Sequence, residues 1–251
     1  MKSVLDLKYG NLPDQILDIH LPDCEEFPVF MYFHGGGIES GGKGLPDTMK
    51  KYFTDHGIAL ASANYRMYPD HKYPDYIEDA ALAVAWLKEH ISEYGKCTEF
   101  YVGGASAGGY LSMMLCFDKK WLGVHGIDCD KDIAGYIHDA GQPTTHFNIL
   151  RREYGVKSAR VIIDEKAPLF HVGTNSVTTR MLFIVSDDDM PGRYEQTQLM
   201  MATLKHFGCD MNKIKLKVMH GTHVHYVGPV DENGVCMYGQ IIVPFILENK
   251  N

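Results

Sequence analysis

A serine inside a short run of glycines is the residue best placed in this sequence to act as a nucleophile. Ser106 is the centre of a G-x-S-x-G pattern in the segment FYVGGASAGGY, residues 100–110. Apolar residues precede the pattern and helix-forming residues follow it, which predicts a strand, a sharp turn and a helix. A serine at the tip of such a turn exposes its hydroxyl, and its neighbours must be small because strand and helix nearly collide. The pattern alone is weak in a chain with 25 glycines, since a plain tight turn or a phosphate-binding turn has the same residue types.

A second glycine run, His34 to Gly37, lies well upstream of this serine and directly follows an apolar stretch. Its glycines could present main-chain N–H groups that no side chain obstructs. Such groups stabilise the negative oxygen that forms when a carbonyl is attacked. A flexible glycine turn is the simpler interpretation of this run by itself. Together the two glycine motifs indicate a hydrolase that attacks carbonyl groups, because such an enzyme needs both parts.

Candidate bases and acids follow predicted strands later in the chain. The histidines are His220, His223 and His225. The carboxylates are Asp139, Asp187, Asp188 and Asp189. A histidine could take the proton of a serine hydroxyl, and a carboxylate could orient that histidine and compensate its charge. Local spacing alone selects neither one histidine nor one carboxylate.

Strand patterns alternate with helix patterns along the chain. Strands are predicted over 15–21, 28–33, 58–63, 100–102, 133–137, 181–185 and 214–219, and helices over 45–56, 76–91, 110–117, 194–207 and 241–247. The period-two segment 15–21 is expected to be the first strand and an edge strand. The alternation predicts an α/β fold with a mostly parallel central sheet and helices on both faces. Ligands bind at the carboxyl ends of the strands in such folds, where the candidate residues lie.

Residues 1–251 are predicted to form one domain, because 45% hydrophobic residues supply a substantial core and no repeat or linker divides the chain. The segment 142–179 mixes polar, aromatic and charged residues and is expected to be a small irregular insertion over the site. Gln142 and His146 in this segment are candidate substrate-binding residues. A solvated surface loop is the alternative interpretation of the same segment.

The net charge of -8 and the sequence pI near 5.9 argue against nucleic-acid or anionic-membrane partners and favour a small-molecule ligand. The N-terminus has no apolar signal region and no run is long enough to span a bilayer, so a cytoplasmic protein is expected. The six cysteines lack C-x-x-C spacing, which predicts reduced thiols and no metal site. The sequence leaves a homo-oligomer possible.

The order of these motifs resembles the α/β-hydrolase superfamily and, within it, short-chain carboxylesterases of the hormone-sensitive-lipase and bacterial esterase type. The likeness runs from about Gln15 to the C-terminus. Besides the two glycine motifs it rests on Asn64-Tyr65-Arg66, on an aspartate after a late strand and on G-x-H at Gly221–His223. It is specific for the superfamily and much less specific for the substrate.

The resemblance implies that Ser106 is the nucleophile and that His223, the histidine of the G-x-H motif, is its base. It also implies an oxyanion hole formed by the main-chain N–H groups of Gly36, Gly37 and Ala107. No metal or organic cofactor is implied.

The family often has G-x-x-D after the late strand and an E-Q-S-like segment on the next helix. Here Ser186 takes the place of the glycine and Glu195-Gln196-Thr197 that of the helix segment, and this register selects Asp189 as the acid. Asp187 is the alternative within a two-residue shift, and Asp139 is a third candidate because some related lipases place their acid after the preceding strand.

Two departures from the family pattern bear on the substrate. Larger relatives carry a helical cap before the first strand, whereas about fourteen residues precede the predicted first strand here. Ile38-Glu39 follows the first glycine run where relatives often have an aromatic residue. We therefore expect a serine carboxylesterase for small soluble esters, such as acetyl or phenolic esters of sugars, working through an acyl-enzyme. A peptidase or amidase of the same fold, and a non-catalytic binding module that kept the fold, are the alternatives.

Overall fold

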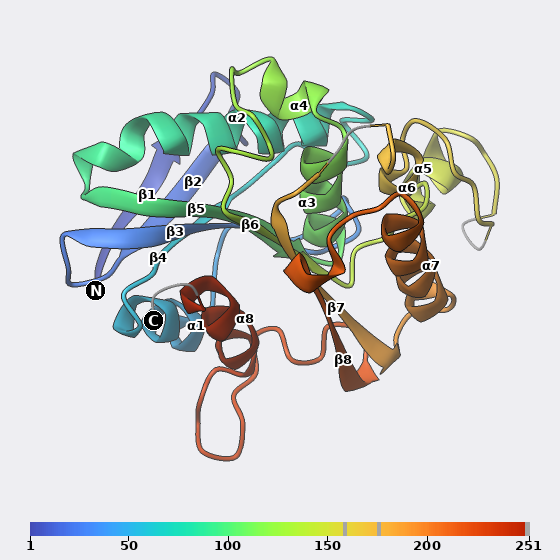
Figure 1. Ribbon diagram of the computed structural model, residues 1–251. Coiled ribbons are helices and arrows are strands. Elements are labelled where there is room, and N and C mark those ends of the chain that lie inside the picture. The colour runs from blue at the N-terminus through green and yellow to red at the C-terminus, as the bar shows by residue number, and fades with distance from the viewer. Residues whose placement is uncertain (158–159, 175–176, 249–251) are drawn as a thin grey trace.

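The computed structural model describes residues 1–157, 160–174 and 177–248, which form one eight-stranded sheet flanked by helices (Figure 1). The strands are β1 (Lys2–Lys8), β2 (Ile16–Leu21), β3 (Glu26–Phe33), β4 (Ala59–Ala63), β5 (Lys96–Ala105), β6 (Gly135–Asp139), β7 (Arg180–Asp188) and β8 (Ile214–Thr222). The helices are α1 (Asp47–Asp55), α2 (Asp75–His90), α3 (Ala107–Phe117), α4 (Lys120–Gly123), α5 (Phe147–Arg152), α6 (Pro168–His171), α7 (Arg193–His206) and α8 (Met237–Leu247), with 3-10 turns at Ile91–Glu93 and Met211–Lys213.

The strand order is β1-β2-β4-β3-β5-β6-β7-β8. β2 pairs antiparallel with β1 and β4, and every other pairing between neighbouring strands is parallel. The prediction of an α/β-hydrolase fold with a mostly parallel sheet is therefore confirmed. The carboxyl ends of β3, β5, β7 and β8 lie at one edge of this sheet, so the glycine runs, the aspartates and the histidines that follow them are brought together.

The prediction that residues 15–21 form the first and outermost strand is wrong. β1 precedes this segment and occupies the edge, while β2 lies inside the sheet. β1 is mostly exposed and therefore carries little hydrophobic pattern for a sequence to reveal. β2 is buried on both faces, so that Asp18 and His20 lie in the interior although the period-two pattern placed them on a solvent face.

Successive residues of the central strands pack into two separate cores. On one face Val29 and Met31 pack with side chains of α2, α3 and α7, and on the other Phe30 and Tyr32 pack with those of α1 and α8. Figure 1 shows α2 and α3 on one side of the sheet and α1 and α8 on the other. Helices thus cover both faces, as the near-continuous apolar strands predict. Across the described ranges, no helix combines the length and the apolar composition needed to cross a bilayer.

The segment expected to be an irregular insertion contains two short helices. α5 and α6 lie between β6 and β7, and the segment's residues 158–159 and 175–176 lie outside the described residues. Both helices are too short to show a helical period in the sequence. The short helix α4 and the 3-10 turn at Met211–Lys213 were not predicted either. Other differences concern element ends: β5 starts before the predicted strand, and α8 starts at Met237 rather than at residue 241.

Residues Asn64 and Tyr65, which follow β4, hold the first glycine run in place. The Tyr65 hydroxyl donates to the main-chain oxygen of His34 at 2.8 Å, and the two rings stack with centroids 4.4 Å apart. The Asn64 side-chain oxygen accepts from the main-chain N–H of Lys43 at 2.7 Å. Both ends of the loop after β3, at His34 and at Lys43, are thereby attached to the residues that follow β4.

Arg66, the next residue, anchors this corner to α2 through a buried carboxylate. Asp79 is fully buried and accepts three hydrogen bonds from Arg66, from its main-chain N–H at 2.8 Å, its Nε at 2.9 Å and one terminal nitrogen at 2.8 Å. The Gln15 side-chain amide donates to the same carboxylate at 2.7 Å. Because the charge of Asp79 is satisfied on all sides, removing it leaves a guanidinium without its main partner.

We predict that Asp79→Ala lowers the free energy of unfolding by about 3–5 kcal/mol, the range found when one member of a buried ion pair is removed. Glu78→Ala is the matched control, because Glu78 contacts the same arginine at 3.5 Å from an exposed position. The control should cost less than about 1 kcal/mol. Urea denaturation of the three proteins measures both values, and equal losses in the two variants would show that the buried network does not hold this corner.

Candidate active site

Ser106 lies at a sharp turn where its main chain has a strained conformation. It connects β5 to α3 with φ 57° and ψ −112°, a conformation that a non-glycine residue rarely adopts. A Cβ atom at Gly104 would lie 2.4 Å from the main-chain oxygen of Phe33, and one at Gly108 would lie 1.9 Å from it. The predicted strand, turn and helix are present, and both glycines of the G-x-S-x-G pattern are needed because the end of β3 passes against them.

The histidine after β8 connects this serine to an aspartate after β7. His223 Nε2 lies 2.8 Å from Ser106 Oγ, and His223 Nδ1 lies 2.6 Å from Asp189 Oδ1. Main-chain N–H groups of Met190 and Ser186 also donate to the Asp189 carboxylate, at 2.7 and 3.3 Å. Burial raises the pKa of Asp189, but the hydrogen bond and charge of His223 and these two amides outweigh it and bring the pKa below its usual value. Asp189 is thus an ionised partner for an imidazolium.

The alternative aspartate after β7 belongs to a different histidine. Asp187 Oδ2 lies 2.5 Å from His220 Nδ1, and Oδ1 accepts from the Gly221 main-chain N–H at 2.9 Å. Both side chains are exposed, that of His220 almost completely. His225 Nδ1 lies 2.8 Å from the main-chain oxygen of Thr222. Neither His220 nor His225 is hydrogen-bonded to Ser106.

The third candidate acid, Asp139, lies at the end of β6 and meets the serine turn through its main chain. Its main-chain oxygen accepts from the Ser106 N–H at 2.8 Å. Its fully buried carboxyl accepts a hydrogen bond from the Tyr226 hydroxyl at Oδ1, while Oδ2 has no partner in the described part of the chain. Burial raises the pKa of Asp139 to about 8, with the Tyr226 hydrogen bond opposing and the charge of Asp189 adding to the rise. The side chain is therefore largely a neutral acid at neutral pH.

The first glycine run lies directly beside the serine. A Cβ atom on Gly35 would lie 3.2 Å from the Cβ of Ser106. Within the described ranges, the main-chain N–H groups of Gly36 and Gly37 donate to no other group of the protein, whereas the main-chain oxygen of Gly36 accepts from Glu39 and Ser40. This run therefore has two amides without a partner in the described ranges, and α3, whose first N–H groups are also unpaired within the helix, begins at Ala107.

An asparagine that sequence reasoning missed fixes the orientation of this glycine run. The side-chain amide of Asn148, on α5, donates to the main-chain oxygen of Gly37 at 2.5 Å. Asn148 is completely buried. A lone asparagine far from every motif gives no sequence signal, because its role depends on α5 reaching back over the loop after β3.

The two predicted substrate-binding residues have different surroundings. The side-chain amide of Gln142 makes most of its hydrogen bonds within the protein. Its nitrogen donates to Thr144 Oγ1 at 3.1 Å and to the Thr145 main-chain oxygen at 3.0 Å, and its oxygen accepts from the Phe147 main-chain N–H at 3.1 Å. It nevertheless forms part of a cavity wall. His146 is buried between Tyr110 and Phe147 and caps α5 through Nδ1. The structure places Gln142, but not His146, at the surface of a cavity.

That cavity has a volume of about 310 Å³. Ser106, His223 and Asp189 do not line it, but residues close to them in the chain or in the fold do. Its wall includes Met190, the neighbour of Asp189, and Phe147, whose ring would lie 3.2 Å from a Cβ on Gly37. Gln142, Pro191, Gln196 and three arginines complete it. The size is at the lower end of the range for small-molecule sites.

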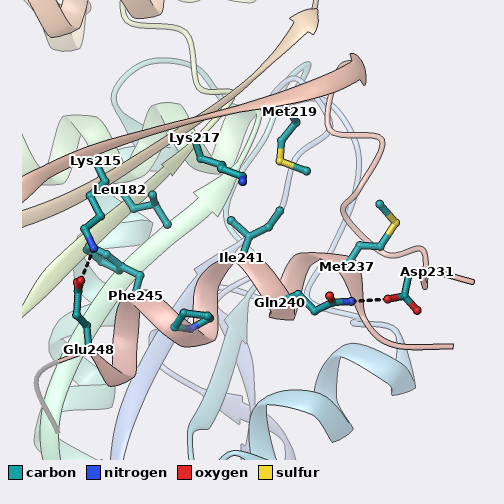
Figure 2. Close-up of a pocket in the computed structure, with 11 residues that line it drawn as sticks. Leu182, Lys215, Lys217, Met219, Asp231, Met237, Gln240, Ile241, Phe245 and Glu248 are labelled. Atoms are coloured by element: carbon teal, nitrogen blue, oxygen red, sulfur yellow. Dashed lines mark hydrogen bonds and ion pairs between the residues drawn. The ribbon is translucent and has the colours of Figure 1, made fainter. Parts of the chain in front are cut away.

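A second cavity, of about 510 Å³, lies between β8 and α8 (Figure 2). Figure 2 shows Lys215 of β8 hydrogen-bonded to Glu248, and Gln240 to Asp231, with Ile241 and other apolar side chains between them. No residue of the serine, histidine and aspartate group lines it. This cavity is on the face covered by α8 and plays no part in the arrangement around Ser106. Among the described residues there is also no group of three or more histidines, cysteines or acids that could hold a metal ion.

A strained serine, a histidine and a buried aspartate, at the carboxyl ends of parallel strands, define the class of α/β-hydrolases with a serine nucleophile turn. Comparison with family models gives the family: the BD-FAE model matches residues 17–182, and the chain belongs to the BD-FAE family.

Curated relatives are esterases that resemble this chain over part of its length. Esterase LipI of Mycobacterium tuberculosis is 38% identical over 104 residues, which is 41% of this chain and 32% of LipI. Carboxylesterase NlhH of the same organism is 32% identical over 111 residues, 43% of this chain and 35% of NlhH. The matched regions thus span about a third of the length of these relatives.

Solved structures share the fold over nearly the whole chain. A truncated carbohydrate esterase from gut microbiota superposes with a TM-score of 0.78 and 17% identity, covering 99% of this chain and 96% of that one. Esterase B from Lactobacillus rhamnosis superposes with a TM-score of 0.77 and 16% identity, covering 99% and 86%. At these identities the likeness shows the fold.

We predict that Asp139→Asn flattens the pH dependence of stability. Because the folded pKa near 8 exceeds the value of about 3.9 in an unfolded chain, the folded state holds a proton between these limits that the unfolded state has lost. The contribution of Asp139 to the free energy of unfolding is complete below about pH 4 and is lost as the pH rises through about 8, at up to about 1.4 kcal/mol per pH unit. Asparagine cannot ionise and retains the oxygen that accepts from Tyr226.

Urea denaturation of the wild type and Asp139→Asn at pH 5 and pH 8 measures this difference. The variant should gain stability relative to the wild type at pH 8, because the wild type must bind a proton at Asp139 on folding and the variant need not. Parallel pH profiles would contradict a neutral Asp139.

Proposed function

We propose that this protein is a serine carboxylesterase with Ser106 as nucleophile, His223 as general base and acid, and Asp189 as the orienting acid. The observation that carries the proposal is the continuous chain of hydrogen-bond contacts from Ser106 Oγ through both nitrogens of His223 to Asp189. Curated relatives named esterase and carboxylesterase support hydrolysis of an ester. The serine, the histidine and the aspartate match the nucleophile, the base and the orienting acid of enzymes that catalyse acyl transfer.

The reaction begins as His223 Nε2 takes the proton of Ser106 and Oγ bonds to the ester carbonyl carbon. The carbonyl oxygen becomes negative and is stabilised by main-chain N–H groups of Gly36, Gly37 and Ala107. When the bond to the alcohol oxygen breaks, the proton on His223 passes to that oxygen and the acyl group stays on Ser106. Water then repeats the sequence, and the free acid leaves. Asp189 stays ionised and holds the imidazolium in position.

The preferred substrates are proposed to be small soluble esters, such as acetyl or phenolic esters of sugars. The cavity of about 310 Å³ supports a small bound group rather than a long acyl chain. The α5–α6 segment lies beside it and is proposed to form part of the roof of the site. A cytoplasmic location is also proposed, supported by six cysteines that are all free thiols.

A fluorophosphonate probe, which reacts with activated serines, and a pair of chromogenic substrates test the reaction class. The purified protein should hydrolyse p-nitrophenyl acetate and become labelled by the probe at Ser106. Faster cleavage of an aminoacyl p-nitroanilide than of the ester would favour a peptidase. A protein that neither turns over the ester nor reacts with the probe would be a binding module.

We predict that Ser106→Ala lowers kcat by about 10⁶-fold and Asp189→Asn by about 10⁴-fold, as removal of the corresponding members of such a triad does. Asp187→Asn is the matched control, because this aspartate lies two residues away and pairs with exposed His220. Its kcat should stay within about twofold of the wild type. Steady-state kinetics on p-nitrophenyl acetate measure all three, and a larger loss for Asp187→Asn than for Asp189→Asn would reverse the assignment of the acid.

We predict that Asn148→Ala lowers kcat about tenfold and leaves KM nearly unchanged, because Asn148 positions the Gly37 peptide without touching substrate. Direct loss of an oxyanion donor costs about 10²–10³-fold in kcat, so an indirect loss should be smaller. Thermal unfolding identifies the part of the effect due to lower stability. A rise in KM with kcat intact would place Asn148 in substrate binding instead.

A further inference from the structure

The cavity of about 310 Å³ lined by Gln142 and Phe147 has a positively charged wall. Among its lining residues are Arg151, Arg160 and Arg193, and no aspartate or glutamate lines it in the described part of the chain. We call it the arginine cavity. The protein as a whole carries a net charge of -8, so this concentration of positive charge is a local feature of the site.

Arg193 is the most unusual member because it is buried without a carboxylate partner. Only 4% of its surface is exposed. Its guanidinium donates to the main-chain oxygen of Ala140 and, at 3.4 Å, to Gln142 Oε1, and it forms no ion pair within the described residues. Burial lowers the pKa of Arg193 to about 10, with the charge of Asp189 opposing, so the group is charged at neutral pH. A buried charge normally has an ion-pair partner, and within the described residues Arg193 has none, because Asp189 acts on it only from beyond ion-pair distance.

The two other arginines leave the positive charge largely uncompensated. Arg151 shares one carboxylate, that of Glu39, with Arg152. Arg160 is exposed at the rim of the cavity and has no ion pair among the described residues. The start of α7 adds main-chain N–H groups beside the cavity, because Met190 and Pro191 line it and the helix begins at Arg193.

Hydrogen bonds connect the wall of the arginine cavity to the residues around Ser106. Met190 donates its main-chain N–H to Asp189, the partner of His223. Arg193 holds the main-chain oxygen of Ala140, the residue next to Asp139, whose own main-chain oxygen accepts from the Ser106 N–H. These contacts connect the cavity wall to Asp189 and to the serine turn, at the same end of the sheet.

We propose that the arginine cavity binds an ionised carboxylate of the substrate. The preferred substrates are then esters whose acyl or alcohol part also carries a free carboxylate, such as monoesters of dicarboxylic acids. This inference rests on the proposed esterase function and narrows its substrate class. The planar guanidinium presents paired N–H donors that match the two oxygens of a carboxylate, and bonds between ionised partners are the stronger kind.

Two matched substrate pairs test the proposal, one for each side of the ester bond. Monophenyl adipate and its carboxamide, phenyl adipamate, differ only in the charge of the acyl part. The corresponding pair for the alcohol part is 4-acetoxybenzoate and 4-acetoxybenzamide. In at least one pair the wild type should have a kcat/KM about tenfold or more higher for the carboxylate, and 0.5 M NaCl should reduce this preference because salt screens the attraction.

Variants identify the cavity as the source of the preference. Arg193→Met should bring the ratio of the carboxylate to the carboxamide close to one, and Arg193→Lys, which keeps a charge but not the paired donors, should give an intermediate ratio. Lys131→Gln is the control. Lys131 is exposed and lies shortly before β6, at the amino ends of the strands and so away from the cavity, and its loss should keep the wild-type ratio. If Arg193→Met does not fold, the double variant Arg151→Gln/Arg160→Gln should lower the ratio several-fold.

The outcomes separate this inference from the proposed function. Efficient cleavage of the carboxamides with no preference for the carboxylates, and equal ratios in all folded variants, would overturn the carboxylate site while leaving the esterase intact. Arg193 would then serve only to hold the main chain at Ala140. Failure of the wild type to cleave any of the four esters would instead contradict the proposed esterase function.

Discussion

The contact between the end of β3 and the first turn of α3 is the constraint on which the site depends. With the Phe33 main-chain oxygen 1.9 Å from where a Cβ of Gly108 would lie, any larger residue there would push the helix away from the sheet. The same contact brings the glycine loop after β3 against Ser106. One steric requirement therefore sets the serine turn and brings the Gly35 backbone against it, and the strained φ of 57° at Ser106 is held by the packing of both elements.

Three aspartates with buried side chains, Asp79, Asp139 and Asp189, show that burial alone does not decide the state of a carboxyl group. Asp79 accepts from Arg66 and Gln15 and forms a buried ion pair with the arginine. Asp189 meets a histidine and two amides, which hold its pKa below the usual value. Asp139 has one tyrosine hydroxyl and a neighbouring negative charge, and its pKa rises to about 8. The number and charge of donors around each group set its role.

Local residue types predicted those parts of the fold and site that depend on local sterics. The serine turn was visible because β5 and α3 tolerate only small residues there, and the buried strands because both of their faces are apolar. β1 was missed since an exposed edge strand needs little hydrophobic pattern. Asp189 and Asp187 could not be separated by local spacing, because the choice depends on how β7 and β8 set His223 and His220 against them. Asn148 and Arg193 gave no signal, since their contacts come from α5 and α7 folding over the strand ends.

Charge at the site is likewise a property of the fold rather than of the composition. The excess of acidic residues argued against a polyanionic partner, and it gave no indication of the arginines that gather between α5 and α7. Within about 10 Å, the screening length at moderate salt, a few buried or partly buried cations outweigh a distant and hydrated negative surface. Arg193 is the sharpest case, because the fold places it where water is scarce and leaves it without a carboxylate. An overall charge thus restricts large partners, whereas the selectivity of an enclosed cavity depends on the few groups that line it.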